Sequence, residues 1–408
     1  MNVDVKYAAD LRKQILAVLN ENFSNLHEIV TKCHGAYPVL VKSILDELVR
    51  EGSIYVENEC YMMSGLVHNY DTNKNAIKGS QIVIDDDSIT HPAEYDWRFS
   101  KASIDRIISD YTEKLSPNSK IALLGTTSLY AGFANRGFET FLFNKSEFLI
   151  DELIKKNFNK GLIVHDLFNP LPSHYNNYFD LVIADPPWYL DYYYSFMLRA
   201  TEILKHNGKM LLSVFPDMTR PSAKKELEVL KAYIDELGFS IESMLPAYFT
   251  YLTPNFESKA LLAEGINFSD SWRNGDLYQL IKDNLSQVNK IGDRTSRDTE
   301  EWYEFLLPPK KRIKIRKRFE VPNTNFSYSF IGDGMVLKNV SRRDPNRNNI
   351  DLWTSDNEVV SVKGIHLLKE ALLLIQHGTH IDATIELLKR KYINQKGFGE
   401  LEDLLRKL

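Results

Sequence analysis

One short segment of the chain holds residue types that can bind an amino group. Asp185 is followed by Pro186, Pro187 and Trp188. Two consecutive prolines cannot continue a strand ladder, so the chain must turn there. The Asp185 carboxylate and the Pro186 carbonyl could accept the two N–H bonds of a planar amine, while Trp188 stacks on its ring. A plain strand terminator beside a packed tryptophan is the alternative without chemistry.

Apolar runs that alternate with amphipathic segments surround this motif, from about residue 95 to residue 267. The predicted strands are 121–124, 140–143, 162–164, 181–184 and 210–213, and the predicted helices are 146–156, 192–205 and 222–237. Strands that alternate with helices indicate βαβ units and an α/β, doubly wound, largely parallel sheet. Such sheets bind ligands at the carboxyl ends of their strands. Asp185 directly follows the fourth predicted strand, so it should lie at that edge.

The motif Asp185-Pro186-Pro187-Trp188 resembles the Asp/Asn-Pro-Pro-aromatic motif of class I S-adenosylmethionine-dependent amino methyltransferases, especially the adenine-N6 enzymes. In that family the aspartate and the first proline carbonyl hold the amine, so that its lone pair faces the sulfonium methyl group. The resemblance implies a Rossmann-like fold, S-adenosylmethionine as the cofactor, and catalysis by positioning for an in-line displacement. It assigns the catalytic role to these four residues.

The same resemblance implies a cofactor site in the loops after the first three predicted strands. The residues expected there are Gly125, Thr126, Ser128, Asn144, Asp166 and Leu167. In the family a glycine-rich turn, a ribose-binding acid and an acid near the adenine amine occupy these places. Here the first loop has a single glycine before Gly132, and Asn144 stands where the acid is usual. Gly125 could simply end a strand, and Asp166 could serve a helix cap or turn.

A second resemblance covers about residues 5 to 265. Tyr95-Asp96-Trp97, the segment from His165 to Pro172, and Asp185-Pro186-Pro187 are similar to sequences of the branched-chain polyamine synthases. Those enzymes share the methyltransferase-like fold and transfer aminopropyl groups from decarboxylated S-adenosylmethionine. Their acidic Gly-Asp-Asp-Asp loop is here Gly125-Thr126-Thr127-Ser128. Because a polycationic amine needs carboxylates to bind and deprotonate it, the uncharged loop favours an amino group that is already neutral.

Four tyrosines crowd the chain just after the motif. They are Tyr189, Tyr192, Tyr193 and Tyr194. The first three could wall a substrate pocket, since stacking contributes roughly 1–3 kcal/mol per base. They also fit the first turn of a core helix. Tyr251, Thr253 and Asn255 are candidates for the far wall.

The first 64 residues form a separate pattern. Apolar residues at helical spacing predict helices at 11–19, 26–33 and 41–49, and segments 53–56 and 60–63 predict a hairpin. Three helices and a hairpin indicate a winged-helix-like domain over 1–64. The third helix has a negative net charge, which favours a docking or oligomerisation module over a DNA contact. Cys33, Cys60 and His68 do not have zinc-finger spacing, so no metal is expected.

The remainder divides into a linker and a last domain. Residues 65–94 lose periodicity and contain Asp85-Asp86-Asp87, which predicts a linker. Residues 268–408 are expected to form a C-terminal mixed α/β domain for substrate recognition or interaction. Seven cations between Lys310 and Arg318 predict a strand with one buried face, either solvated or in contact with nucleic-acid phosphates. Helices are predicted near 365–375, 381–388 and 401–405, with a faint similarity to small peptide-binding winged-helix modules.

Composition bounds these interpretations. The 408 residues carry a net charge of -5 and two cysteines. Few cysteines indicate a reducing, cytoplasmic setting. The N-terminus shows no signal peptide, and no apolar stretch approaches the ~18 residues of a membrane span. A globally basic nucleic-acid binder is excluded.

The leading hypothesis is an S-adenosylmethionine-dependent N-methyltransferase acting on an amino group, with adenine N6 of nucleic acid as the first candidate. Nucleic acid or a nucleotide would bind through Lys310 to Arg318. A peptide or polyamine acceptor and a homo-oligomer stay open. Aminopropyl transfer in branched polyamine synthesis is the second enzyme hypothesis. The third is a non-catalytic binding protein of the methyltransferase fold, which the missing glycine and Asn144 would favour.

Overall fold

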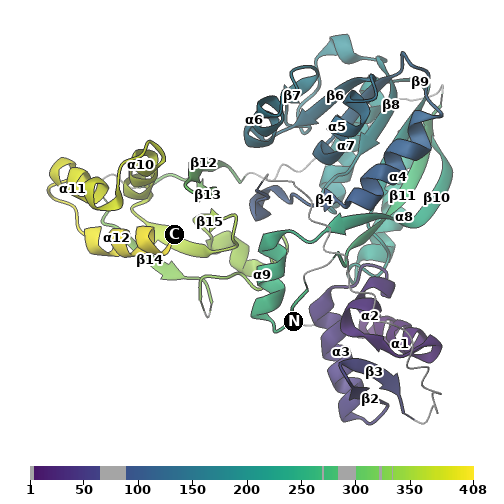
Figure 1. The fold of residues 1–408 in the computed structure, drawn as a ribbon, viewed down its shortest axis with the longest axis horizontal. Helices are drawn as coiled ribbons and strands as arrows, with labels where there is room; N and C mark the ends of the chain where they lie inside the picture. The colour runs from purple at the N-terminus through teal and green to yellow at the C-terminus, as the bar shows by residue number, and fades with distance from the viewer. Residues whose placement is uncertain (1–3, 65–88, 269–270, 284–299, 321–323, 333) are drawn as a thin grey trace. The chain divides into compact units, whose positions relative to one another are not determined.

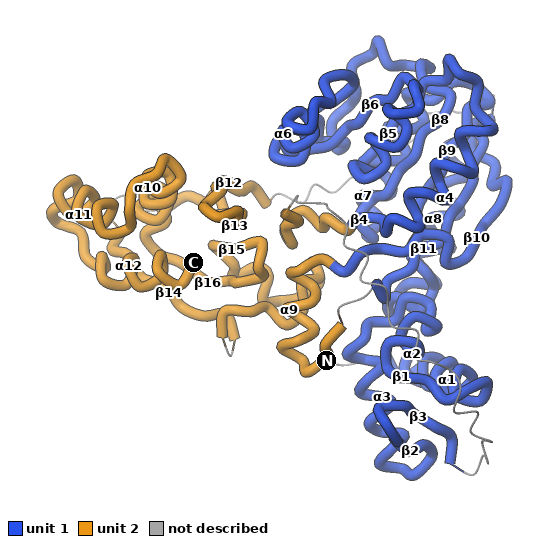
Figure 2. The backbone as a smooth tube through the Cα atoms, in the orientation of Figure 1, with its two compact units in different colours: residues 1–86, 98–253, 270–297 blue, residues 87–97, 254–269, 298–408 orange. Residues whose placement is uncertain are grey.

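The chain forms two compact units in a computed structural model (Figure 2). Unit 1 comprises residues 1–86, 98–253 and 270–297, and unit 2 comprises residues 87–97, 254–269 and 298–408. The structure describes residues 4–64, 89–268, 271–283, 300–320, 324–332 and 334–408. Most of the predicted linker, with its three aspartates, lies outside these described residues.

The N-terminal part of unit 1 has the three predicted helices and the predicted hairpin (Figure 1). Its elements are α1 (Val5–Glu21), β1 (Ser24–Asn25), α2 (Leu26–Lys32), α3 (Pro38–Arg50), β2 (Ile54–Glu57) and β3 (Cys60–Met63). The strands pair in the order β1-β3-β2. α2 begins at a capping box between Asn25 and Glu28, and the apolar faces of the helices bury residues such as Leu11, Ile15 and Leu45. The winged-helix assignment itself stays an interpretation of this element order.

An eight-stranded sheet makes up the rest of unit 1. Its strands are β4 (Arg98–Phe99), β5 (Lys120–Leu124), β6 (Glu139–Asn144), β7 (Leu162–Val164), β8 (Phe179–Ala184), β9 (Leu204–Val214), β10 (Phe239–Leu252) and β11 (Asn274–Lys282). They lie in the order β4-β10-β11-β9-β8-β5-β6-β7. Pairing is parallel from β7 to β9 and antiparallel among β9, β11, β10 and β4. The five predicted strands are all present.

Helices connect the strands as predicted. They are α4 (Lys101–Thr112), α5 (Tyr130–Ala134), α6 (Glu147–Lys155), α7 (Leu190–Ile203) and α8 (Ala223–Glu236), with 3-10 turns η2 (Thr127–Leu129) and η3 (Ser173–Tyr175). The α/β, Rossmann-like methyltransferase fold expected for this region is confirmed. Among the described helices, none is both long and apolar enough to cross a membrane.

The division of the chain differs from the predicted boundaries at 95 and 268. β11 lies between β9 and β10 in the main sheet, although its residues follow the predicted end of that domain. Conversely, residues 89–97 and α9 (Asn255–Ala263) belong to unit 2. The reason is physical: antiparallel partners such as Leu280 and Met210 are far apart in sequence, so local periodicity carries no sign of their pairing.

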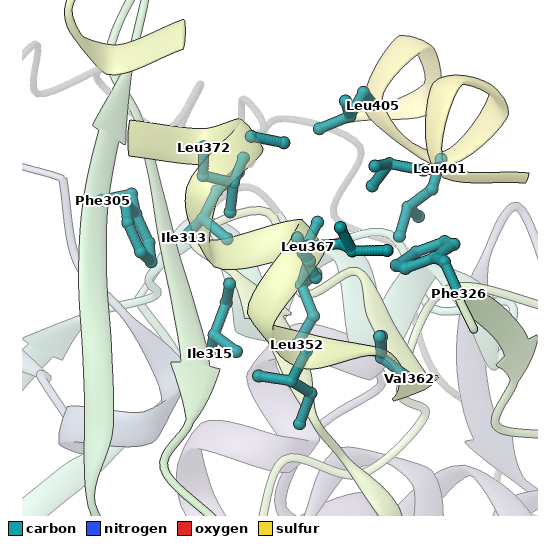
Figure 3. Close-up of a cluster of buried hydrophobic side chains, with 14 of the residues drawn as sticks. Phe305, Ile313, Ile315, Phe326, Leu352, Val362, Leu367, Leu372, Leu401 and Leu405 are labelled. Carbon is teal, nitrogen blue, oxygen red and sulfur yellow. The ribbon is translucent and has the colours of Figure 1, made fainter. Parts of the chain in front are cut away.

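In the described residues, unit 2 combines α9 with an antiparallel sheet and three C-terminal helices. Its strands are β12 (Trp302–Leu307), β13 (Lys311–Arg316), β14 (Ser327–Phe330), β15 (Leu352–Thr354) and β16 (Val359–Lys363), in the order β12-β13-β15-β16-β14. The remaining elements are η1 (Pro92–Glu94), η5 (Pro345–Asn349), α10 (Ile365–Gln376), α11 (Ile381–Lys391) and α12 (Phe398–Lys407). Figure 3 shows α10 contributing Leu367 and Leu372 to the same apolar cluster as Ile313 and Ile315 of β13. The three predicted helices are therefore present and form one core with the sheet.

Candidate active site

The chain places the start of the predicted Asp185-Pro186-Pro187-Trp188 motif at the centre of the main sheet. β8 pairs with β5 on one side and β9 on the other, and the chain reaches β8 only after passing through β6 and β7. β5 and β8 are therefore the strands between which the order reverses, where open α/β sheets bind ligands. Asp185 immediately follows β8, and its backbone N–H donates to the carbonyl of Leu124, the last residue of β5, over 3.2 Å.

Gly125, which follows β5, packs directly against this motif. Its φ is +71°, a conformation that favours glycine. A methyl group in its place would lie 3.3 Å from the carbonyl oxygen of Asp185 and 3.1 Å from Cε1 of Phe196. The backbone at Gly125 is thus free of a side chain where it approaches Asp185. The loop predicted to hold the cofactor and the motif predicted to hold the acceptor amine are in contact.

A hydrogen-bond network orients the Asp185 carboxylate. The Tyr251 hydroxyl on β10 donates to Oδ1 of Asp185 over 2.7 Å and also contacts the hydroxyl of Ser213 on β9. Because the tyrosine proton is directed at the carboxylate, the serine hydroxyl is the donor in the second bond. Burial, and next the Asp185 charge, raise the pKa of Tyr251 well above its usual value, so the phenol stays protonated. The sequence named Tyr251 only as a candidate wall and did not identify Ser213.

Trp188 is packed rather than open. Its side chain is 6% exposed. The Arg273 guanidinium lies over the indole, with its central carbon 3.7 Å from the ring centroid, and the Tyr251 ring meets it edge-on at 5.8 Å. A methyl group at Gly275 would lie 3.3 Å from Cζ2 of Trp188, so this position of β11 needs a residue without a side chain. A substrate ring could stack on Trp188 only if neighbouring groups moved, and the stacking role stays a prediction.

The tyrosines after the motif lie at the start of α7 (Leu190–Ile203). Tyr189, Tyr192 and Tyr193 are all buried, and Tyr192 meets Phe168 edge-on at 5.0 Å. The Tyr193 hydroxyl donates to the carbonyl of Ser213 over 3.1 Å. Their arrangement matches the core-helix alternative, with Tyr193 fixing the end of β9. Their predicted substrate contacts are untested. Asn255 is a residue of unit 2, where its amide donates to Asp356 over 2.7 Å.

Asn144 is committed to local structure at the end of β6. Its amide nitrogen donates to the hydroxyl of Thr127 over 3.0 Å, and its amide oxygen accepts the backbone N–H of Ser146 over 2.8 Å. Asn144 therefore ties the loop after β5 to the loop after β6. This supports a positioning role in the cofactor region more directly than the predicted ribose contact.

The other predicted cofactor residues take backbone-supporting positions. Oδ1 of Asp166 accepts the N–H of Phe168 over 3.0 Å, which is the predicted turn alternative. The Leu167 carbonyl accepts the Ser195 hydroxyl, and Thr126 is buried beneath the loop after β5. Ser128 is half-buried in η2, three residues after Gly125. All of them follow β5 or β7, at the edge of the sheet where Asp185 lies.

Among the described residues, no group of three or more histidine, cysteine, aspartate or glutamate side chains is placed to hold a metal ion. Cys33 is fully buried against the helices of the N-terminal domain, and burial raises the pKa of its thiol to about 12. His68 lies outside the described residues.

The basic run is built into the sheet of unit 2. Arg312, fully buried, and Lys314 on β13 both pair with Glu94, over 2.8 Å and 2.6 Å, and Arg316 pairs with Glu300 over 3.2 Å. Further ion pairs to carboxylates involve Lys311, Lys317 and Arg318. The predicted single buried face is wrong, because charged and apolar side chains of β13 are both buried. The phosphate contact stays a prediction. The ion pairs just described already neutralise cations that it would use.

Comparison with known proteins finds similarity to branched-chain polyamine synthases. The family model described as the branched-chain polyamine synthase A C-terminal domain matches residues 144–302, a range that contains Asp185, Ser213, Tyr251 and Arg273. The branched-chain polyamine synthase of Thermus thermophilus has a similar structure. Its C9 mutein, in complex with N4-aminopropylspermidine and 5'-methylthioadenosine, superposes with a TM-score of 0.54 at 14% identity, over 72% of this chain and 96% of that one. The unmutated synthase gives 0.50 at 14% identity, over 71% and 96%.

A protein of Methanocaldococcus jannaschii described as uncharacterized is 30% identical over 129 residues. That match spans 31% of this chain and 32% of the relative, so the chain covers about a third of that protein's length. At 14% identity the structural likeness shows a shared fold. Together with the family model, it gives similarity to a polyamine synthase in the region that carries the candidate site.

Proposed function

We propose that this chain is an adenosylsulfonium-dependent N-alkyltransferase that moves a methyl group from S-adenosylmethionine to an amino nitrogen held by Asp185. The observation that carries the proposal is the contact between Gly125 and Asp185. A methyl group at Gly125 would lie 3.3 Å from the Asp185 carbonyl, so a cofactor seated on the loop after β5 would face an amine held by the motif. A class of reaction that depends on positioning needs this proximity above all.

The residues around the motif fit the handling of an amine. The bound sulfonium would supply an electrophilic carbon and leave as a thioether when nitrogen attacks. The Asp185 carboxylate and the Pro186 carbonyl would orient the amine. Proline has no backbone N–H, so Pro186 offers only an acceptor here. After attack the nitrogen carries one surplus proton, and Asp185 is placed to accept it. Tyr251 donates to Asp185 and holds one carboxylate oxygen in place.

The cofactor loop fits an adenosyl group in backbone shape more than in side-chain contacts. A side chain at Gly125 would press on the Asp185 carbonyl and on Phe196, so the glycine lets this loop lie close to the motif. Asn144, in contrast, spends both ends of its amide on Thr127 and Ser146. We therefore assign Asn144 to holding the two loops in register, and not to direct ribose binding.

Aminopropyl transfer from decarboxylated S-adenosylmethionine is the second candidate. The family model and the Thermus thermophilus structures favour it. The loop Gly125 to Ser128 argues for a different acceptor, because it offers no carboxylate to a polycation. Arg273 also lies over Trp188, beside the motif, where an ammonium group would otherwise find an aromatic face. We therefore favour a neutral amine as acceptor. An adenine amino group is one such acceptor.

Nucleic acid as the acceptor polymer rests on the motif alone. The cations of β13 that would contact phosphates are paired with carboxylates of unit 2. A free nucleoside, a nucleotide or another small amine is therefore at least as good a first substrate to test as DNA or RNA.

Calorimetry and a transfer assay test the proposal together. The protein is titrated with S-adenosylmethionine, S-adenosylhomocysteine and decarboxylated S-adenosylmethionine, and labelled methyl transfer is then followed to adenosine, nucleotides, RNA, DNA and spermidine. We expect the first two ligands to bind and Asp185→Ala to abolish transfer while cofactor affinity changes little. Asp235→Ala, at an exposed position of α8, is the matched control.

Three results would contradict the proposal. Binding of the decarboxylated cofactor alone, with alkyl transfer to spermidine, would replace it with the aminopropyl reaction. Failure of all three adenosyl ligands to bind at millimolar concentration would favour a non-catalytic protein of the same fold. Transfer that survives Asp185→Ala would remove the motif from the mechanism.

A further inference from the structure

Two segments that touch the candidate acceptor site are held by the N-terminal domain of unit 1, residues 4–64. The first follows β9. Phe215 in this segment lies with its ring 6.5 Å from that of Trp188 and 5.6 Å from that of Tyr193, and its N–H donates to the Tyr193 hydroxyl over 3.3 Å. The second precedes β11 and contains Arg273, whose guanidinium covers Trp188. These segments, 215–222 and 271–273, therefore set what surrounds Trp188.

The first segment contacts α1 and the turn between α2 and α3. The buried hydroxyl of Tyr7 donates to the carbonyl of Met218 over 2.7 Å. At Gly35, with φ +81°, an added methyl group would lie 3.0 Å from Oγ1 of Thr219 and 3.3 Å from Cγ of Pro216. The backbone of the N-terminal domain thus packs against this segment with no room for a side chain.

The second segment is held by α2 and by the residue that precedes α3. A ring nitrogen of His27, Nε2, lies 3.1 Å from the carbonyl oxygen of Ser271. The ring of Tyr37 meets that of Trp272 edge-on at 6.3 Å, and Trp272 is buried beside Arg273 in the chain. One small domain therefore contacts both segments that frame Trp188, from three different elements.

We infer that the N-terminal domain is a positioning element of the acceptor side of the site. It would fix Phe215 and Arg273 around Trp188 and so set the affinity for the acceptor, while the cofactor loops after β5 and β6 are held independently by Asn144 and Thr127. The inference rests on the proposed function only for the statement that the acceptor binds beside Trp188. It gives this domain a role other than DNA contact.

A pair of glycines in the domain provides a matched test. Gly35 and Gly52 both have positive φ, +81° and +75°, so alanine causes similar backbone strain at each. Nothing lies within 4 Å of a methyl group at Gly52, whereas one at Gly35 would press on Thr219 and Pro216. Gly35→Ala should raise the acceptor KM about tenfold, with the cofactor Kd by calorimetry changed less than twofold. Gly52→Ala should leave the acceptor KM unchanged.

A spectroscopic readout makes the test independent of turnover. In protein labelled with 5-fluorotryptophan, the fluorine resonances of Trp188 and Trp272 should shift in Gly35→Ala and stay in place in Gly52→Ala. The resonance of Trp353, in unit 2, should not move in either variant. Assignment comes from Trp188→Phe and Trp272→Phe.

A tyrosine pair guards against a misfolded Gly35→Ala. Tyr7→Phe removes only the bond to Met218, and Tyr55→Phe changes a half-exposed tyrosine of β2 in the same domain. Tyr7→Phe should shift the Trp188 resonance, and Tyr55→Phe should not. Equal resonances and equal acceptor KM in both glycine variants and in both tyrosine variants would overturn the inference. If no adenosyl ligand binds, the proposed function fails, yet the fluorine resonances still decide the positioning role.

Discussion

Two charged features stand out in this sequence, and they have opposite settings in the fold. Asp185 is a single carboxylate at a strand end, and the hydroxyl of Tyr251 donates a hydrogen bond to it over 2.7 Å. The cations of the basic strand β13, in unit 2, instead form ion pairs with carboxylates. The Glu94 side chain is 7% exposed, and one of its oxygens contacts both Arg312 and Lys314.

The difference teaches how charge is used in the two units. The Tyr251 hydroxyl is a neutral donor, so it orients the Asp185 carboxylate without adding a counter-charge, which suits a site for an amine. The charge of a carboxylate between two buried cations is neutralised within the fold. Burial alone would raise the pKa of Glu94, but Lys314 and Arg312 outweigh it and hold that pKa far below the usual range. The density of charge in a sequence is therefore a poorer guide to function than the position of one charge at a strand end.

The largest effect should come from breaking the buried cluster of unit 2. Glu94→Gln leaves Arg312 and Lys314 buried without their shared counter-charge, which typically costs about 3–5 kcal/mol. We expect the free energy of unfolding of unit 2 to fall by that amount in urea denaturation followed by Trp353 fluorescence. Glu301→Gln is the control, because its partner Lys317 is 3.6 Å away and the pair is exposed. A loss below about 1 kcal/mol for Glu94→Gln would show that Arg312 and Lys314 do not depend on Glu94 as their counter-charge.

A smaller but more specific effect is expected at the site. Tyr251→Phe removes the donor to Asp185, so transfer should slow about 100-fold, the scale of one misplaced catalytic group. Cofactor affinity should stay within about twofold. Tyr248→Phe is a close match on the same strand, because Tyr248 also donates to an aspartate, Asp110, over 2.6 Å. Equal rates in the two variants would mean that Tyr251 serves stability alone.

The strands and helices of unit 1 could be predicted because their signals are local. Apolar runs such as Leu181 to Ala184 and the break at Pro186 mark a buried strand and its end without reference to the rest of the chain. The position of Asp185 followed from them. The network around it did not, since Ser213 and Tyr251 come from strands β9 and β10, whose register is set by pairing through β11. One signal was available: a glycine inside the apolar alternation of β11, Gly275, indicates a close approach.

The basic run shows the opposite case. Seven cations in nine residues predict a strand with one exposed, charged face. The acidic residues that pair with them lie up to 220 residues away in the chain, as Glu94 does from Lys314. No local pattern identifies such partners. The same holds for Asn144, whose place after the second predicted strand suggested a ribose contact and whose amide is bonded to Thr127 and Ser146. Spacing predicts where a side chain lies, and only the fold shows what it is bonded to.

The last prediction separates the two units by pH. His91 is fully buried in unit 2; its Nδ1 accepts the N–H of Ala93 over 3.1 Å, so Nε2 carries the proton and donates to the Trp353 carbonyl over 3.0 Å. Burial first, and then Lys314 and Arg312, lower its pKa well below the usual value. Below about pH 6.5 the unfolded chain binds a proton at His91 that the folded unit does not, so stability falls as pH falls, by up to about 1.4 kcal/mol per pH unit. Urea unfolding of unit 2 between pH 7 and 5 measures this slope. His91→Phe changes the level of stability but should flatten the slope, and a slope unchanged by that substitution would assign the pH dependence to other groups. His91 belongs to unit 2, so over the same range the unfolding of unit 1 should lack this contribution.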